Sequence, residues 1–273
     1  MSSGIFDTHC HLNFEAFDKQ VSAVISAAKA AGISYIVIPG TDVKTSIAGV
    51  AIAERFAGIY AAIGIHPHHV FSLKSANLND KSLMQTIEKL LPNKKVVAIG
   101  EVGLDRHYYE QTKYKNYETG EDFIALQKKL LAEQINLALK YKKSLILHNR
   151  EAKNDTIEVL EKKWNRKLEG KTVFHCCEPD QELLNFAQKH KIFIGVDGDV
   201  TYRTDKQEFV KKIPLDLLVL ETDSPFLKPA GYKFPNQPKN LKAIADFLAQ
   251  INKTSANHLI DVTTKNAKRL FSL

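Results

Sequence analysis

The sequence predicts an α/β fold, a (β/α)8 TIM-type barrel with its active site at the carboxyl ends of the strands. Eight short apolar or β-branched runs alternate with amphipathic stretches at helical spacing. The length of 273 residues agrees with one such barrel. Ionisable side chains follow many of the runs at once, at the end where barrel enzymes assemble their active sites.

The eight runs are expected to form parallel strands, because each parallel strand needs a crossover helix and amphipathic stretches separate the runs. In chain order the runs cover residues 5–11, 35–39, 60–66, 96–102, 144–148, 172–176, 192–196 and 217–222. Helical periodicity is clearest at residues 21–28, 123–138 and 241–248. No linker or low-complexity tract separates the runs, so we expect one domain over residues 1–273. A doubly wound open sheet is the alternative arrangement.

The composition bounds the class of protein. A formal net charge of +7 helps to attract a polyanion without proving one, and many lysines fall on predicted solvent faces of helices. No apolar run approaches the length of a membrane span and the first residues do not resemble a signal peptide, so we expect a cytoplasmic protein with no membrane partner. Three cysteines without C-x-x-C spacing indicate reduced thiols. The oligomeric state is not predicted.

Metal-ligand side chains stand at the ends of several runs. His9 and His11 are two residues apart, so on a strand both rings point to the same side. A single histidine at a strand end is more often a packing residue, but four of them with two carboxylates at one level predict a metal site. The candidate ligands are His9, His11, Glu101, His148, His175 and Asp223. Strand alternation would turn Cys10 and Cys176 away from the barrel interior.

The candidate set is larger than one tetrahedral metal requires, which favours two divalent metal ions per chain, bridged by a carboxylate and a water. Glu101 is assigned the bridge. The His-x-His pair and Asp223 would complete one metal, and His148 and His175 the other. Asp223 would also orient the attacking water or take its proton. Imidazole with carboxylate suits Zn²⁺, Mn²⁺, Co²⁺ or Fe²⁺, whereas Mg²⁺ prefers oxygen ligands, so these residues do not decide which metal binds.

The same run ends form recognisable blocks of sequence. They are Phe-Asp-Thr-His-Cys-His-Leu at 6–12, Gly-Ile-His-Pro-His at 64–68, Gly-Glu-Val-Gly-Leu-Asp at 100–105, Leu-Ile-Leu-His-Asn-Arg at 145–150, Val-Phe-His-Cys at 173–176 and Leu-Glu-Thr-Asp-Ser-Pro at 220–225. With the segment 266–271 they cover nearly the whole chain. In content and order they resemble the signature blocks of the TatD-related metal-dependent deoxyribonucleases, a family within the amidohydrolase superfamily.

The resemblance implies a distorted eight-stranded barrel, a two-metal site and hydrolysis of DNA, often from the 3′ end. It places the family's metal ligands on the six residues named above and its additional active-site histidine on His66. We therefore expect a 3′–5′ exonuclease in which Asp223, Glu101 and His66 are catalytic. His66, Arg150 and Arg203 are expected near the phosphate. The expected partner is DNA, single-stranded or at 3′ ends, and the metals are Mg²⁺, Mn²⁺ or Zn²⁺, with magnesium favoured by the family.

Three segments depart from the family's pattern. Residues 175–179 read His-Cys-Cys-Glu-Pro where the family commonly has His-Cys-Phe-Ser/Thr-Gly, and residues 235–238 read Pro-Asn-Gln-Pro in place of Arg-Asn-Glu-Pro. The substrate surface near the second metal is therefore expected to differ. A long loop at 107–120 is interpreted either as a lid or as a surface that stacks on bases. Its aromatic and basic residues are Tyr108, Tyr109, Tyr114, Tyr117, Lys113 and Lys115.

Two other functions are compatible with these residues. One is a hydrolase that uses the same metal site on a small amide, ester or lactone, as relatives in the amidohydrolase superfamily do. Activity on such compounds with none on DNA would favour it. The other is a non-catalytic nucleic-acid-binding barrel, which would bind DNA without cleaving it at any metal.

Overall fold

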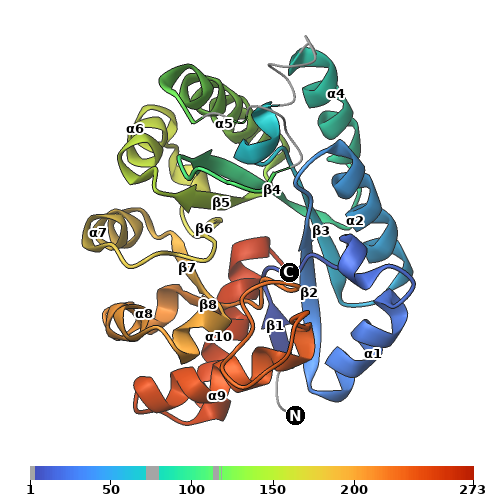
Figure 1. The fold of residues 1–273 in the computed structure, drawn as a ribbon, viewed down its shortest axis with the longest axis vertical. Coiled ribbons are helices and arrows are strands. Elements are labelled where there is room, and N and C mark those ends of the chain that lie inside the picture. Colours follow the sequence, from blue (N-terminus) through green and yellow to red (C-terminus); the bar gives the residue numbers. More distant parts are fainter. Residues whose placement is uncertain (1–3, 72–79, 113–116, 118) are drawn as a thin grey trace.

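Eight parallel strands form one sheet in the order β1-β2-β3-β4-β5-β6-β7-β8, with the helices packed around its outside (Figure 1). The structure is a computed structural model that describes residues 4–71, 80–112, 117 and 119–273. The strands are β1 (Ile5–Asp7), β2 (Ile33–Pro39), β3 (Ile59–Ile63), β4 (Val96–Asp105), β5 (Ser144–Arg150), β6 (Thr172–Phe174), β7 (Phe193–Val196) and β8 (Leu218–Leu220). The predicted (β/α)8 barrel is confirmed.

Crossover helices connect the strands, as the parallel order requires. They are α1 (Val21–Ala30), α2 (Val43–Arg55), α4 (Asp80–Leu90), α5 (Glu121–Tyr141), α6 (Lys153–Lys163), α7 (Gln181–His190) and α8 (Thr204–Val210), followed after β8 by α9 (Leu241–Ile251) and α10 (Ala256–Phe271). Short 3-10 turns occur at Glu15–Phe17, Pro67–His69, Arg166–Leu168, Gly198–Thr201, Leu215–Leu217 and Pro238–Asn240. None of the helices in the described part of the chain has the length and apolar character needed to cross a bilayer.

The barrel closes beyond the ends of its first and last strands. The backbone N–H of Thr8 donates to the carbonyl of Leu220 at 3.0 Å, and that of Asp223 donates to His9 at 2.9 Å. The pairing of β4 with β5 shifts register between Ile99 and Val102. Such a bulge re-aims the side chains beside it. The closure therefore depends on the segments that carry the candidate ligands, and the bulge contains Glu101.

Apolar side chains fill the barrel interior below the site. One buried cluster joins Phe6, Val37, Ala62, Ala98, Ile146, Val173, Phe193 and Val219, one residue from each strand. The end of α10 closes this interior, since Phe271 stacks on Phe6 with ring centroids 5.7 Å apart. A larger cluster packs the helices against the outside of the sheet. The interior is a packed core, so ligands can gather only at its carboxyl end.

Strand alternation carries this interior face into the site. His148 follows the inward-facing Ile146 by two residues, and His175 follows Val173 by two. The expected runs overlap all eight observed strands, but several boundaries were wrong. β1 ends at Asp7 and not at residue 11, because the chain turns to pair with the segment after β8. The bend places His9 and His11 beyond the strand.

Candidate metal centre

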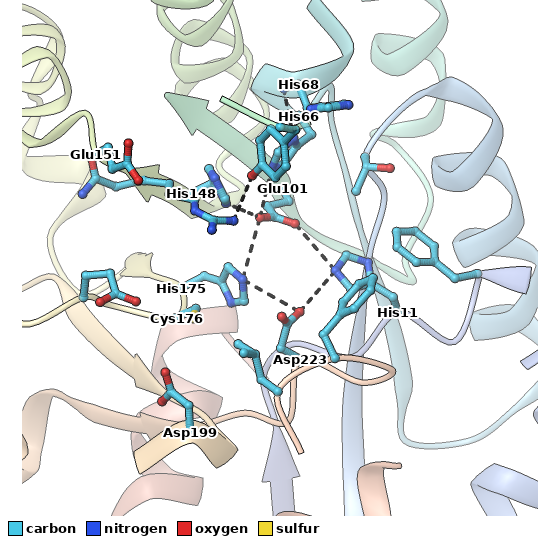
Figure 2. A pocket seen from close by; sticks show the side chains of 18 of the residues that line it. His11, His66, His68, Glu101, His148, Glu151, His175, Cys176, Asp199 and Asp223 are labelled. Carbon is cyan, nitrogen blue, oxygen red and sulfur yellow. Dashed lines mark hydrogen bonds and ion pairs between the residues drawn. The ribbon is translucent and has the colours of Figure 1, made fainter. Parts of the chain in front are cut away.

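The six predicted ligands meet at the carboxyl end of the barrel. Figure 2 shows His11, Glu101, His148, His175 and Asp223 around the centre. They come from the segment after β1, the bulge in β4, the end of β5, and the residues just after β6 and β8. The structure brings all six together from distant parts of the sequence. Five of the six are buried, and only His148 is partly exposed, with 16% of its side chain accessible.

Glu101 faces two groups of histidines with its two carboxylate oxygens. Its Oε2 lies 3.4 Å from His9 Nε2 and 3.7 Å from His11 Nε2. Its Oε1 lies 2.8 Å from His148 Nδ1 and 3.7 Å from His175 Nε2. A carboxylate with one oxygen directed to each group has the arrangement needed to bridge two cations.

Asp223 lies on the other side of the centre from Glu101 (Figure 2). Its Oδ1 is 3.4 Å from His11 Nε2, 3.7 Å from His9 Nε2 and 3.9 Å from His175 Nε2. The residue has a left-handed backbone, with φ of 49°, and is held by its hydrogen bond to the carbonyl of His9. Asp223 therefore faces the first histidine group and also reaches the second.

The donor set fits divalent cations. The Nε2 atoms of His9 and His11 lie 3.1 Å apart, so at most one hydrogen can satisfy the pair, while two carboxylate oxygens point at the same place. The Nδ1 atoms of both rings are buried without a hydrogen-bond partner among the described residues. A cation coordinated by the two Nε2 atoms would relieve this crowding. Ligand-type groups that could hold a metal form at His9, His11 and Glu101, and at Glu101, His148 and His175.

Two further carboxylates stand behind the second histidine group. His148 Nε2 donates to Asp105 Oδ2 at 3.1 Å, and His175 Nδ1 donates to Glu221 Oε1 at 3.0 Å. Such outer carboxylates fix the ring that a metal binds and raise its basicity. Sequence reasoning assigned neither residue a role. A signal was present for Glu221, which follows the inward-facing Val219 by two residues, whereas the β4 bulge hides the position of Asp105.

In the metal-free protein, protons on two of the histidines balance the negative charge of the neighbouring carboxylates. Burial lowers the pKa of His148, but its hydrogen bonds to Asp105 and Glu101 outweigh burial and raise the pKa to about 9. Burial likewise opposes protonation of His175, but the charges of Glu221 and Glu101 raise its pKa to about 10. Burial lowers the pKa of His9 to about 4. Positive charge beside the buried carboxylates therefore stabilises them, and either protons on the histidines or bound cations can provide it.

His66 caps the turn at Pro67–His69 and is placed as a hydrogen-bond donor. Its Nδ1 accepts the backbone N–H of His68 at 3.1 Å, so in the neutral ring the proton is on Nε2. Burial lowers its pKa, which favours that neutral ring. The Nε2 lies 3.4 Å from Glu101 Oε1. His66 therefore offers an N–H at the centre and not a free metal-binding lone pair.

A pocket of about 930 Å³ opens above the centre, and both predicted arginines line it. Arg150 donates to the Tyr109 hydroxyl at 3.1 Å and lies over its ring. No carboxylate among the described residues pairs with Arg150. Arg203, in contrast, donates twice to Glu178, at 2.9 and 2.8 Å, and is also paired with Asp199 and Asp205. The guanidinium group of Arg150 is therefore more available to bind an anion than that of Arg203.

The three predicted tyrosines of the 107–120 loop that the structure describes lie in different environments. Tyr117 is buried and packs edge-on against Phe123, so it is not available to a ligand. Tyr109 donates its hydroxyl to Asp105 at 2.7 Å, while Tyr108 is exposed. The remaining predicted residues, Tyr114, Lys113 and Lys115, lie outside the described residues.

The cysteine expectation was correct for Cys10, which is buried, and wrong for Cys176, which lines the pocket. Strand alternation stops applying because β6 ends at Phe174. Cys176 then takes a left-handed backbone with φ of 45°.

Comparison with known proteins agrees with this geometry. A sequence model of the family described as TatD related DNase matches residues 6–272. A relative from Bacillus subtilis (strain 168), named uncharacterized metal-dependent hydrolase YabD, is 34% identical over 272 residues, which cover 98% of this chain and 99% of the relative. The crystal structure of YjjV, a TatD homologue from Escherichia coli K12, matches with a TM-score of 0.84 at 27% identity and covers 98% of both chains. A TatD family hydrolase from Entamoeba histolytica shows the same fold, with a TM-score of 0.81 at 22% identity over 99% of both chains. The chain belongs to the TatD-related DNase family, and it is a metal-dependent hydrolase.

Proposed function

We propose that the protein is a deoxyribonuclease that hydrolyses phosphodiester bonds with two divalent cations. The ligands are His9, His11, Glu101, His148, His175 and Asp223. One observation carries the proposal: the two oxygens of Glu101 are directed to two separate groups of imidazoles, 3.4 Å from His9 and 2.8 Å from His148. Nothing in barrel packing explains so many buried ionisable groups at one end.

The chemistry is divided between the cations and the chain's own residues. Bound cations supply Lewis acidity and make water a better nucleophile near neutral pH. Asp223 accepts the proton that the attacking water gives up, as a new P–O bond forms and the ester P–O bond breaks, and the leaving sugar oxygen takes a proton from solvent to become a hydroxyl. His66 donates its Nε2–H to a phosphate oxygen, and Arg150 binds the phosphate from the rim. Arg203 remains a predicted phosphate contact, but it would have to release one of its paired carboxylates before it could bind the phosphate.

The substrate we propose is single-stranded DNA or a 3′ end, shortened in the 3′ to 5′ direction in the cytoplasm. The family's description as DNases supports DNA, and the net charge of +7 favours a polyanion. A pocket of about 930 Å³ suits the end of a single strand better than a continuous duplex. The same volume lies within the range of small-molecule sites, which keeps the amide, ester or lactone hydrolase as the second candidate.

The test is a time course on single-stranded DNA labelled at its 3′ or its 5′ end. Metal-stripped protein is resupplied with Mg²⁺, Mn²⁺ or Zn²⁺, beside a Glu101→Gln variant and a panel of small amides, esters and lactones. We expect metal-restored shortening from the 3′ end that the Glu101→Gln variant lacks. Turnover of the small compounds alone would favour the amide, ester or lactone hydrolase. DNA binding without cleavage at any metal would indicate a non-catalytic barrel.

A further inference from the structure

Besides Tyr109, three phenylalanine or tyrosine side chains line the pocket, and two of them are about half exposed. They are Phe14, which is half-buried, Tyr202, which is 53% exposed, and Phe226, which is 47% exposed. Exposed aromatic rings that adjoin an active site add little to the core and are informative about ligands. The catalytic account above uses none of these rings.

Phe14 and Phe226 form a corner directly beside a candidate metal ligand. The Phe14 ring stacks on His11, with centroids 4.2 Å apart and planes 21° apart. The Phe226 ring stands nearly perpendicular to both, at 73° to Phe14 and 71° to His11, with centroid distances of 6.1 and 6.2 Å. The part of the Phe226 ring that these contacts leave uncovered lines the pocket.

Backbone hydrogen bonds fix the chain segments that carry both rings. The N–H of Phe226 donates to the carbonyl of Asp223 at 2.8 Å, so the backbone that carries this ring is fixed relative to the ligand. The N–H of Phe14 donates to the carbonyl of His11 at 3.2 Å. Each ring is therefore three residues from a candidate ligand and tied to it through one turn. A preorganised surface of this kind loses little conformational entropy when a flat group binds.

We propose that Phe14 and Phe226 bind the nucleobase of the nucleotide next to the phosphate being cleaved. The inference rests on the proposed nuclease function. A base is separated from its phosphate only by the sugar, and the corner is separated from the metal centre only by His11. Stacking of a base on an aromatic ring is tolerant of sequence, because every base has a flat face. A base in a duplex must first leave its stack, so the corner selects for unpaired bases.

The corner offers a stacking surface that does not depend on the loop at 107–120, of which residues 113–116 and 118 lie outside the described residues. In that loop Tyr117 is buried in the core, and Tyr109 is held by Asp105. Phe226, in contrast, is exposed and lies within the pocket.

The test compares single-stranded oligonucleotides that carry a stable abasic residue at the first, second or third position from the end that the enzyme shortens. For the wild type we expect removal of one particular base to raise KM by about tenfold, since that is the contribution of one stacked base. Phe226→Ala should raise KM for the unmodified strand by a similar factor and should no longer respond to the missing base. Phe226→Tyr should restore the wild-type pattern, because its ring can stack in the same way.

A matched control comes from the same connection. Phe234 is 67% exposed and does not line the pocket, so Phe234→Ala should behave as the wild type. Phe14→Leu supplies a second variant of the corner with a similar volume and no ring. Cleavage that depends on the base equally in the wild type and in Phe226→Ala would overturn the assignment and leave the nuclease standing. Wild-type protein that cleaves no oligonucleotide with any metal would overturn the proposed function as well.

Discussion

The imidazole of His148 is held between two carboxylates, with Nε2 3.1 Å from Asp105 Oδ2 and Nδ1 2.8 Å from Glu101 Oε1. Because Glu101 lies at the centre and Asp105 lies behind the ring, Nδ1 is the nitrogen directed to a metal and Nε2 carries the proton. The orientation of this ligand therefore depends on Asp105, a residue that is fully buried.

Asp105→Asn should weaken metal binding without removing the ligand itself. We expect a loss of about 10- to 100-fold in affinity at the position formed by His148 and His175, because the ring loses the carboxylate that orients it and raises its basicity. Titration of metal-stripped protein with Mn²⁺ measures this directly. Glu151→Gln is the control, since Glu151 also lines the pocket but pairs with His107. Equal affinities in wild type and Asp105→Asn would exclude the positioning role.

Metal binding should depend strongly on pH. The pKa values of about 9 for His148 and about 10 for His175 mean that both rings are in the doubly protonated, positively charged form at pH 7 in metal-free protein. A cation must displace these protons, so its affinity should rise as the pH rises from 7 towards 9, with about two protons released per chain at pH 7. Calorimetry in buffers of different ionisation enthalpy measures the release. Binding without proton release at pH 7 would contradict the assigned charges.

Lys206 should be essential to the stability of the wall beside the pocket. It is fully buried, and its Nζ lies 2.9 Å from Asp197 Oδ2 and 2.6 Å from Asp199 Oδ1. Lys206→Met leaves buried Asp197 without a cation and Asp199 with Arg203 alone, which should lower the free energy of unfolding by about 3–5 kcal/mol. Lys211→Met, which removes an exposed pair with Glu208, should change it by no more than about 0.5 kcal/mol.

The Lys206→Met variant should also acquire a pH dependence of its own. Without the cation the folded-state pKa of Asp197 rises above its unfolded value, and that of Asp199, which burial and the charge of Asp197 already raise to about 7, rises further. The folded state then binds more protons than the unfolded state, so stability falls as the pH rises. Urea unfolding at pH 5.5 and pH 8 should show a larger deficit, relative to the wild type, at pH 8. A deficit that is the same at both pH values would argue against charge as the cause.

The two pocket arginines should contribute unequally to DNA binding. Arg150 is available to a phosphate, whereas the charge of Arg203 is already neutralised by Glu178, Asp199 and Asp205. Arg150→Ala should reduce the slope of the logarithm of affinity against the logarithm of salt concentration by up to about one, with a smaller change for Arg203→Ala. Fluorescence anisotropy with a labelled single strand gives both slopes. The reverse order would show that phosphate displaces the carboxylates.

Several candidate ligands of this centre could be predicted because they stand at the carboxyl ends of apolar runs. His148 and His175 each follow an inward-facing residue by two, which is the period of a strand. Glu101 was predicted from its residue type and position after an apolar run. Its direction depends on the bulge between Ile99 and Val102, which no periodicity shows.

Other features depend on contacts between distant segments. Arg203 is surrounded by carboxylates from Glu178, which precedes α7, and from Asp199, in the turn after β7. Lys206 reads as an ordinary helix lysine in the sequence, and only the fold buries it against two aspartates. Tyr117 lies in a loop whose composition left a lid and a stacking surface open, and only the fold shows that it packs on Phe123 in the core. Local sequence patterns cannot predict such contacts, because the contacting residues come from distant segments that meet only in the folded protein.

The most direct test of the centre is the Mn²⁺ stoichiometry and electron paramagnetic resonance spectrum of the metal-stripped protein. A carboxylate that bridges two cations brings them close enough for their spins to couple, so we predict two Mn²⁺ per chain with a spin-coupled spectrum. In Glu101→Gln the coupling should be lost together with affinity at one or both positions. A wild-type protein that binds one Mn²⁺, or two without coupling, would contradict the bridging role of Glu101 and with it the two-metal account.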